Sequence, residues 1–309
     1  MADRVFLLGP TASGKTSLGV ALAKELDAEI LSLDSMLVYR DLNIATAKPT
    51  VTEQDGVPHH LMNLVGVDQS FSVAQYREAS LAAEADVRSR GKQVLYVGGT
   101  PMWLRALVHG LVEVPPVPQA LEQELQQQWA AEGGPARIRE ALQEVDPEVA
   151  ERIHPHDERR HIRALGTYRA TGRSLGDWQG QWKPDQHALG ETALCLDWPR
   201  EALHARLTKR LSMMEDEGLF AEVQALSEDP GFGPTAAKAI GVSAVLRHFQ
   251  GELTREQAMA ETLRATKTLV RRQATWLRRF PDLRRLEMQE GEAPLLLLAR
   301  AMSALTAEL

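Results

Sequence analysis

The sequence predicts an α/β fold in which a parallel sheet carries helices on both faces and a helical insertion interrupts the chain. Short apolar runs alternate with segments of helical periodicity, which is the pattern of parallel strands joined by covering helices. A proline-rich stretch near the middle is followed by helical patterns alone. The 309 residues are 44% hydrophobic, which is enough to bury a substantial core.

The first predicted elements are a strand, a loop and a helix. An apolar run at Val5–Leu8 ends at Gly9 and is followed by a turn rich in glycine, serine and threonine. Leu18, Leu22 and Leu26 then recur at the spacing of one helix face. This order predicts that the loop lies between the end of a strand and the start of a helix.

Two further strands are predicted at 30–33 and 94–97. The first closes on Asp34 and the second on a Gly-Gly-Thr turn at 98–100. Ligands collect beyond the carboxyl ends of parallel strands. We therefore expect Gly9, Asp34 and the 98–100 turn to converge at one site.

A proline-rich stretch at 114–118 opens the predicted insertion, whose helical patterns continue to about residue 185. A fourth strand pattern at 193–196 returns the chain to the sheet. The predicted domains are a core of 1–113 and 190–309 and a helical insertion of 114–189. Helical patterns in the core cover about 73–88, 200–217, 218–226 and 255–280.

Composition excludes several classes of protein. A formal net charge of −7 and a pI near 5.8 argue against a wholly basic nucleic-acid binder, although a local basic face remains compatible with them. The single cysteine, Cys195, excludes an internal disulfide and a cysteine-rich zinc module. The N-terminal apolar run is too short for a signal peptide, and no run approaches the length of a membrane span. We expect a reduced, cytoplasmic protein with no membrane partner.

Residues 9–16 match the phosphate-binding loop (P-loop) pattern G-x-x-x-x-G-K-[ST] in full, with the required strand before and helix after. Backbone N–H groups of such a loop bind phosphate oxygens, the lysine adds a cation, and the final hydroxyl can hold Mg²⁺. The alternative is a glycine-rich turn without a ligand. The predicted phosphate-binding residues are Gly9, Pro10, Thr11, Ala12, Ser13, Gly14, Lys15 and Thr16, with Thr16 as the metal ligand.

The loop predicts a bound polyphosphate without identifying it. A nucleotide hydrolase, a small-molecule kinase and a diphosphate-using transferase are all compatible with it. A hydrolase would be expected to follow with a strand that ends in a magnesium-binding aspartate and a water-positioning residue. The best candidate is Asp34, which is followed instead by the segment Ser35-Met36-Leu37-Val38-Tyr39-Arg40.

The chain resembles the tRNA dimethylallyltransferase family in a set of short motifs that span nearly its whole length in the family's order. Each motif is weak alone, and their joint occurrence behind a P-loop is specific. The motifs are Asp34-Ser35-Met36-Leu37-Val38-Tyr39-Arg40, Thr46-Ala47-Lys48-Pro49, Pro58-His59-His60-Leu61, Val97-Gly98-Gly99-Thr100, Ile153-His154-Pro155, the segment 160–165, Ala239-Ile240-Gly241 and Arg272-Gln273-Ala274-Thr275-Trp276.

The resemblance implies transfer of a dimethylallyl group from dimethylallyl diphosphate to N6 of the adenosine 3′ of the tRNA anticodon, with Mg²⁺ as the only cofactor. It implies that Asp34 is the base that deprotonates the amine, that Thr100 is a second hydrogen-bonding contact, and that Arg210 binds the donor diphosphate. Taken alone, Asp34 could instead be a helix N-cap, Thr100 a turn hydroxyl and Arg210 a solvated helix residue.

The predicted macromolecular partner is the anticodon stem-loop of tRNA, bound by a monomer. Basic residues are dense around 158–173 and 264–279, with Trp276 inside the second run, which suits an RNA backbone and splayed bases. The alternative interpretation of these basic residues is a solvated helix face. The family resemblance implies tRNA contacts at Asp34, Ser35, Met36 and Leu37 and at Glu158, Arg159, Arg160, His161 and Ile162.

Three rival functions remain at this stage. A kinase would use ATP, a free-adenylate isopentenyltransferase would use a nucleotide acceptor, and a non-catalytic RNA-binding regulator would keep its function without Asp34. The histidine pairs 59–60 and 154/156 lack the neighbouring ligands of a zinc site and are interpreted as loop contacts.

The chain departs from the family pattern at several positions. Asn43 and Ala45 replace a common Asp and Gly, Pro101 follows the Gly-Gly-Thr turn, and 242–244 lack the usual aromatic and charged residues. Glu122 stands where an arginine is frequent, which argues against a tRNA contact there. None of these changes removes a predicted catalytic group.

Overall fold

A computed structural model of the chain describes residues 4–111, 114–179 and 189–306. The chain divides into two compact units, one formed by 1–108 with 187–309 and the other by 109–186. Within the described residues, none of the helices combines the length and hydropathy that crossing a bilayer requires.

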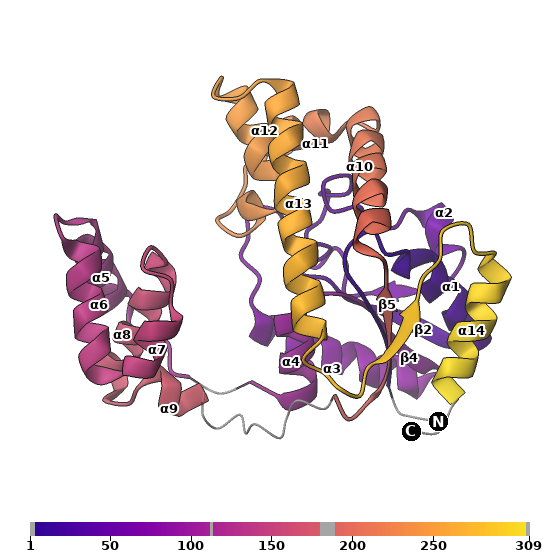
Figure 1. The fold of residues 1–309 in the computed structure, drawn as a ribbon, viewed down its shortest axis with the longest axis horizontal. Coiled ribbons are helices and arrows are strands. Elements are labelled where there is room, and N and C mark those ends of the chain that lie inside the picture. The colour runs from indigo at the N-terminus through magenta and orange to yellow at the C-terminus, as the bar shows by residue number, and fades with distance from the viewer. Residues whose placement is uncertain (1–3, 112–113, 180–188, 307–309) are drawn as a thin grey trace. The chain divides into compact units, whose positions relative to one another are not determined.

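The first unit is built on a six-stranded sheet in the order β3-β2-β4-β1-β5-β6, with every neighbouring pair parallel (Figure 1). The predicted α/β fold with a parallel sheet is therefore confirmed. The strands are β1 (Val5–Leu8), β2 (Ala28–Leu33), β3 (His59–His60), β4 (Gln93–Gly98), β5 (Thr192–Asp197) and β6 (Arg284–Glu287).

Helices cover both faces of this sheet. The helix α1 (Lys15–Glu25) and the C-terminal helix α14 (Pro294–Thr306) lie beside each other and bury one face with the odd-numbered side chains of β1 (Figure 1). The opposite face buries Phe6 and Tyr96 under α3 (Val73–Ser89) and α4 (Pro101–His109). Burial on both faces explains why the central strands read as continuous apolar runs.

The remaining helices of the first unit follow β5 or connect strands. α10 packs along α13, and α11 and α12 pack against them. Their bounds are α2 (Val51–Gln54), α10 (Arg200–Asp216), α11 (Leu219–Glu228), the short 3₁₀ helix η1 (Ala236–Lys238), α12 (Val242–Phe249) and α13 (Arg255–Leu277).

The second unit is helical throughout its regular structure, with its own apolar core around Leu125, Ile138, Leu142 and Leu165. Aspartate N-caps start two of its helices: Asp146 accepts from the N–H of Val149, and Asp157 accepts from the N–H of Arg160. The helices are α5 (Gln119–Ala130), α6 (Gly134–Val145), α7 (Pro147–Arg152), α8 (Glu158–Thr171) and α9 (Leu175–Gln179).

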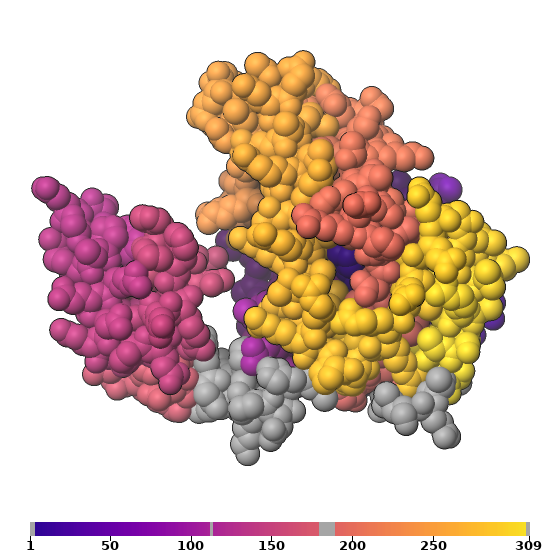
Figure 2. Space-filling view, in the orientation of Figure 1, coloured from indigo at the N-terminus to yellow at the C-terminus, as the bar shows by residue number. Residues whose placement is uncertain are grey.

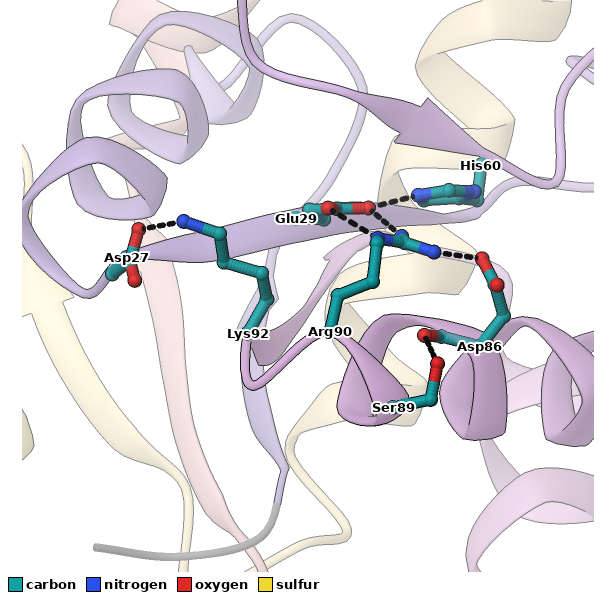
Figure 3. A network of polar contacts seen from close by, with 7 residues as sticks. All are labelled: Asp27, Glu29, His60, Asp86, Ser89, Arg90 and Lys92. Atoms are coloured by element: carbon teal, nitrogen blue, oxygen red, sulfur yellow. Dashed lines mark hydrogen bonds and ion pairs between the residues drawn. The ribbon is translucent and has the colours of Figure 1, made fainter.

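The sequence analysis missed the two edge strands and the helices α2, α4, α12 and α14. β3 has two residues and β6 is polar at three of four positions, so neither carries an apolar run. The interpretation of His59 and His60 as loop contacts is wrong because both belong to β3. The His60 ring lies 2.6 Å from a Glu29 carboxylate oxygen, and Arg90 binds the same carboxylate (Figure 3).

Candidate active site

Three strand ends meet beside the P-loop. In the sheet register Leu8 and Leu33 both lie opposite Gly98, so the residues that follow β1, β2 and β4 share one edge. A Cβ at Gly98 would lie 2.2 Å from the Leu33 carbonyl oxygen, and one at Gly99 would lie 2.4 Å from that of Gly9. The predicted convergence is confirmed, and it requires glycine at both positions.

The P-loop curls through left-handed backbone conformations at Ala12 (φ 62°) and Gly14 (φ 93°). Among the described residues, the N–H groups of Ala12 and Gly14 have no hydrogen-bond acceptor. Lys15 begins α1, and its Nζ donates to the Pro10 carbonyl at 2.6 Å. Free N–H groups beside a lysine and a helix N-terminus form a site for an anion.

Arg206 on α10 and Trp198, just before this helix, bind carbonyl oxygens of the P-loop. The indole N–H of Trp198 donates to the Ser13 carbonyl at 2.9 Å, and Arg206 Nε donates to the Ala12 carbonyl at 2.8 Å. The Arg206 guanidinium also stacks 4.5 Å above the Trp198 ring. The loop is therefore braced through its carbonyl oxygens.

Charges of opposite sign gather beside the loop. Burial lowers the pKa of Lys15 to about 8, the charge of Asp34 opposes this change, and the charge of Arg210 adds to it. Burial also lowers the pKa of Arg210, opposed by the charges of Glu53 and Asp34. The structure thus brings the predicted residues Asp34, Lys15 and Arg210 into one electrostatic environment.

Asp34 and Thr100 fix the turn after β2. Asp34 Oδ1 accepts from the Met36 N–H at 2.8 Å, and Thr100 Oγ1 accepts from the Ser35 N–H at 3.2 Å. The alternative of Asp34 as a helix N-cap is wrong because the next helix begins only at Val51. Asp34 is partly exposed, and its second carboxylate oxygen has no hydrogen-bond partner among the described residues, so it can accept from a ligand.

Arg210 is not a solvated helix residue. It lies on α10, is partly buried, and its Nη2 donates to the Ala47 carbonyl at 3.3 Å. Ala47 belongs to the Thr46-Ala47-Lys48-Pro49 motif. Contact with that motif and proximity to Lys15 and Asp34 make Arg210 part of the same site.

The sequence analysis gave no role to Gln273, which the structure places at the centre of this site. Its side chain is buried, accepts from the Thr11 N–H at 3.1 Å and donates to the Gly99 carbonyl at 2.9 Å. Gln273 therefore joins the P-loop to the turn that carries Thr100. The available signal was a glutamine on the buried face of a long helix, where an unpaired amide is costly.

The residues predicted to contact tRNA fall into exposed and buried groups. Ser35, Met36 and Leu37 are partly exposed, and Glu158, Arg159 and Arg160 are exposed on α8. His161 and Ile162 are buried in the helical unit, and the His161 ring packs 5.4 Å from that of Trp129. These two side chains can shape the face of α8 but do not present a surface to RNA.

A small cavity of about 130 Å³ lies on the β5 side of the P-loop. Figure 2 shows a hollow between α13 and α10 with indigo atoms of the N-terminal part of the chain at its floor. The cavity draws its lining from these same elements and from β5 and β6: Pro10, Cys195, Leu196, Asp197, Trp198, Leu203, Ala274, Leu277, Arg278 and Arg285.

A family model and curated relatives match most of the chain. The family described as IPP transferase matches residues 37–280. The chain is 38% identical over 296 residues to tRNA dimethylallyltransferase 2 of Geotalea uraniireducens, covering 94% of this chain and 93% of that protein. It is 41% identical over 281 residues to tRNA dimethylallyltransferase of Salinispora tropica, covering 90% and 86%.

Solved structures show the same likeness. The tRNA isopentenylpyrophosphate transferase of Bacillus halodurans superimposes with a TM-score of 0.69 at 28% identity and covers 99% of this chain and 97% of its own. A eukaryotic dimethylallyltransferase acting on tRNA superimposes with a TM-score of 0.75 at 25% identity and covers 93% and 74%.

Proposed function

The chain belongs to the IPP transferase family, and we propose that it transfers a dimethylallyl group from dimethylallyl diphosphate to N6 of the adenosine 3′ of a tRNA anticodon. Dimethylallyl transfer to tRNA is the activity in the names of the relatives that match over most of the chain. The observation that supports the atomic assignment is the grouping of Lys15, Arg210 and Asp34 beside the P-loop.

The cationic part of this group binds the donor. Lys15, Arg210 and the free N–H groups of the loop hold the diphosphate, whose negative charge grows as the bond to the allylic carbon breaks. Donors fixed in advance on a developing charge are typically worth about 100- to 1,000-fold each in rate. The side chains of Trp198 and Arg206 support this by holding the loop's carbonyl oxygens.

Asp34 acts on the acceptor adenosine as the general base. The N6 nitrogen attacks C1 of the allyl group, the C1–O bond breaks, diphosphate leaves, and the N6 proton passes to the Asp34 carboxylate. Thr100 fixes the turn beside Asp34 through its bond to the Ser35 N–H. The adenine amine is a poor nucleophile, and a positioned base contributes about 100- to 10,000-fold.

Magnesium fits the donor site. Thr16 is the second residue of α1, and its hydroxyl has no hydrogen-bond partner among the described residues. The part of the chain that the structure describes contains no group of three His, Cys, Asp or Glu side chains that could bind a metal. Thr16 together with diphosphate oxygens would hold Mg²⁺, which neutralises the leaving group.

We assign tRNA binding to Asp34–Leu37 and to the exposed residues of α8 in the helical insertion. Glu158, Arg159 and Arg160 lie in the first turn of α8, where the arginines can contact phosphates. The target base must leave its stack to reach Asp34. A tRNA substrate implies that the protein works in the cytoplasm, and we expect it to do so as a monomer.

The test is incubation of the protein with Mg²⁺, labelled dimethylallyl diphosphate and unmodified tRNA, with AMP as an alternative acceptor and ATP as an alternative donor. Label should enter tRNA, and Asp34→Asn should abolish this while the protein still binds the donor. Label in AMP alone would assign a free-adenylate transferase. Phosphate transfer from ATP without prenylation would assign a kinase, and tRNA binding without transfer would assign a regulator.

A further inference from the structure

A loop from Asn43 to Lys48, called here the 43–48 loop, links the turn after β2 to helix α2. Its backbone is closed on itself, because the Ala47 N–H donates to the Ile44 carbonyl and the Lys48 N–H to the Asn43 carbonyl, both at 2.9 Å. The Ala47 carbonyl then accepts from Arg210. The position of this loop therefore affects where the Arg210 guanidinium lies.

One carboxylate from a distant helix holds this loop. Glu222 Oε2 accepts from the N–H groups of Asn43 at 2.8 Å and Ile44 at 2.7 Å, and its Oε1 accepts from that of Ala45 at 2.9 Å. Glu222 lies on α11, more than 170 residues further along the chain. Hydrogen bonds to an ionised acceptor are roughly twice as strong as neutral ones.

The three N–H groups need this partner. No helix begins at residues 43–45, so these groups have no ladder or helix to join, and Ala45 is buried. Three consecutive N–H groups that point to one place form a concave site for an anion. In this chain the anion is the Glu222 side chain itself.

Glu222 and Arg210 act on the same short segment from two neighbouring helices. Arg210 binds the loop from α10 through Ala47, and Glu222 binds it from α11 through residues 43–45. A second cation fixes the end of the loop, because Lys48 Nζ donates to the Tyr39 carbonyl and to Asn63 Oδ1, both at 2.6 Å. With Glu222 removed, the segment that carries the Ala47 carbonyl loses these three hydrogen bonds to α11.

We propose that Glu222 is a positioning residue for the donor diphosphate, acting by holding the 43–48 loop so that the Ala47 carbonyl fixes Arg210. The inference rests on the proposed function of Arg210. Glu222 does not touch the diphosphate. Its removal should affect the use of the donor and leave the use of tRNA unchanged.

The experiment compares Glu222→Gln and Glu222→Ala with Glu228→Gln, which changes an exposed glutamate at the end of the same helix. Glutamine keeps the size of the side chain but loses the charge and one acceptor, whereas alanine loses all three hydrogen bonds. We expect the KM for dimethylallyl diphosphate to rise about 10-fold in Glu222→Gln and more in Glu222→Ala. The KM for tRNA should be unchanged, and Glu228→Gln should match the wild type.

A double-mutant cycle with Arg210→Ala separates positioning from general stabilisation. If Glu222 acts through Arg210, adding Glu222→Gln to Arg210→Ala should cause no further loss in kcat/KM for the donor. Additive losses, or an equal rise in the KM for tRNA, would overturn the proposal. Hydrogen exchange should also show faster exchange of the amides of residues 43–45 in both Glu222 variants.

The cycle also distinguishes this inference from the proposed function. If Arg210→Ala leaves donor use unchanged, the assignment of Arg210 to the diphosphate is wrong. If Arg210→Ala weakens donor use and Glu222→Gln does not, the assignment stands and only the role of Glu222 is wrong.

Discussion

The side-chain oxygen of Gln273 accepts a hydrogen bond from the Thr11 N–H at 3.1 Å across 262 residues of sequence. The nitrogen of the same amide donates to the Gly99 carbonyl at 2.9 Å. A single buried side chain thus sets the spacing between the P-loop and the turn that carries Thr100. Its replacement should therefore impair the use of both the diphosphate donor and tRNA.

Gln273→Ala should lower stability by about 1–3 kcal/mol, because it leaves the partly buried Thr11 N–H and the buried Gly99 carbonyl without this partner. The rate of prenyl transfer should also fall, because the P-loop and the 98–100 turn lose the side chain that joins them. Urea unfolding and kcat/KM for each substrate measure the two effects. Gln224→Ala, at an exposed glutamine of α11, is the control and should change neither. Unchanged kinetics in Gln273→Ala would show that the site does not depend on this bridge.

Thr100→Val should reduce kcat by roughly 10- to 100-fold, as expected when a partly buried partner is lost and the Ser35 N–H is left without an acceptor. Thr100→Ser keeps the hydroxyl and should retain most of the activity. Single-turnover transfer to tRNA measures the chemical step directly. Equal loss in the two variants would mean that the methyl group of Thr100, and not its hydroxyl, is what the site requires.

Donor binding should be accompanied by proton uptake near pH 8. Because burial lowers the pKa of Lys15 to about 8, about half of the lysines are neutral at that pH, and a bound diphosphate restores the charge. Uptake should be small at pH 7, where the lysine is already protonated. Calorimetry in buffers of different ionisation enthalpy measures it.

Two variants assign this proton. Lys15→Arg keeps a cation that does not titrate in this range, so proton uptake should vanish. Lys48 also has a pKa lowered by burial to about 8. Its Nζ, however, donates to the Tyr39 carbonyl and to Asn63 Oδ1, and we assign it no contact with the donor. Proton uptake should therefore persist in Lys48→Met. If it is lost in that variant, Lys48 takes up the proton and the assignment to Lys15 is wrong.

Replacing Arg159 and Arg160 by alanine should weaken tRNA binding without affecting the donor. If each arginine contacts a phosphate, the slope of log affinity against log salt should fall by roughly one for each. Filter binding at several salt concentrations measures this. Arg137→Ala, at an exposed arginine of α6 in the same helical unit, is the matched control. A uniform loss of affinity with no change of slope would argue against phosphate contacts.

The polar network at the start of β2 should make stability depend on pH. Burial opposes ionisation of Glu29, but hydrogen bonds from Arg90 and His60 outweigh it and hold the pKa of this carboxyl below its ordinary value (Figure 3). The stabilisation is therefore complete above the unfolded pKa of about 4.3 and is lost as the pH falls through the lower folded pKa.

Glu29→Gln should have a shallower fall in unfolding free energy between neutral and acidic pH than the wild type. Thermal or urea unfolding across this range measures the difference. Glu78→Gln replaces an exposed glutamate on α3 and should leave the profile unchanged. Identical profiles for Glu29→Gln and the wild type would show that this carboxylate does not contribute.

The local features of the catalytic core follow from the sequence because each depends on neighbouring residues. The strand Val5–Leu8 has the bounds that its apolar run predicts, and α3 and α10 lie within one residue of their patterns. The P-loop motif lies between the required strand and helix. The family resemblance, read from short motifs in order, is confirmed by the match over residues 37–280.

Features that depend on a partner elsewhere in the chain could not be read locally. The strands β3 and β6 are short and polar, and they become strands only because β2 and β5 offer an unpaired edge. Asp34 after a strand had the helix cap as an alternative role, and the long irregular segment before α2 decides against that. Periodicity records which face of an element is buried, not what covers it.

The sequence by itself determined the four central strands of the sheet, several of the helices, the P-loop and the identity of its charged residues, because dihedral preferences and hydrophobic period are properties of neighbouring residues. Only the tertiary structure decided that Gln273 reaches the P-loop and that Glu222 binds the 43–48 loop. Those contacts join segments more than 170 residues apart, and they depend on sheet register and helix packing that form only when the whole core is assembled.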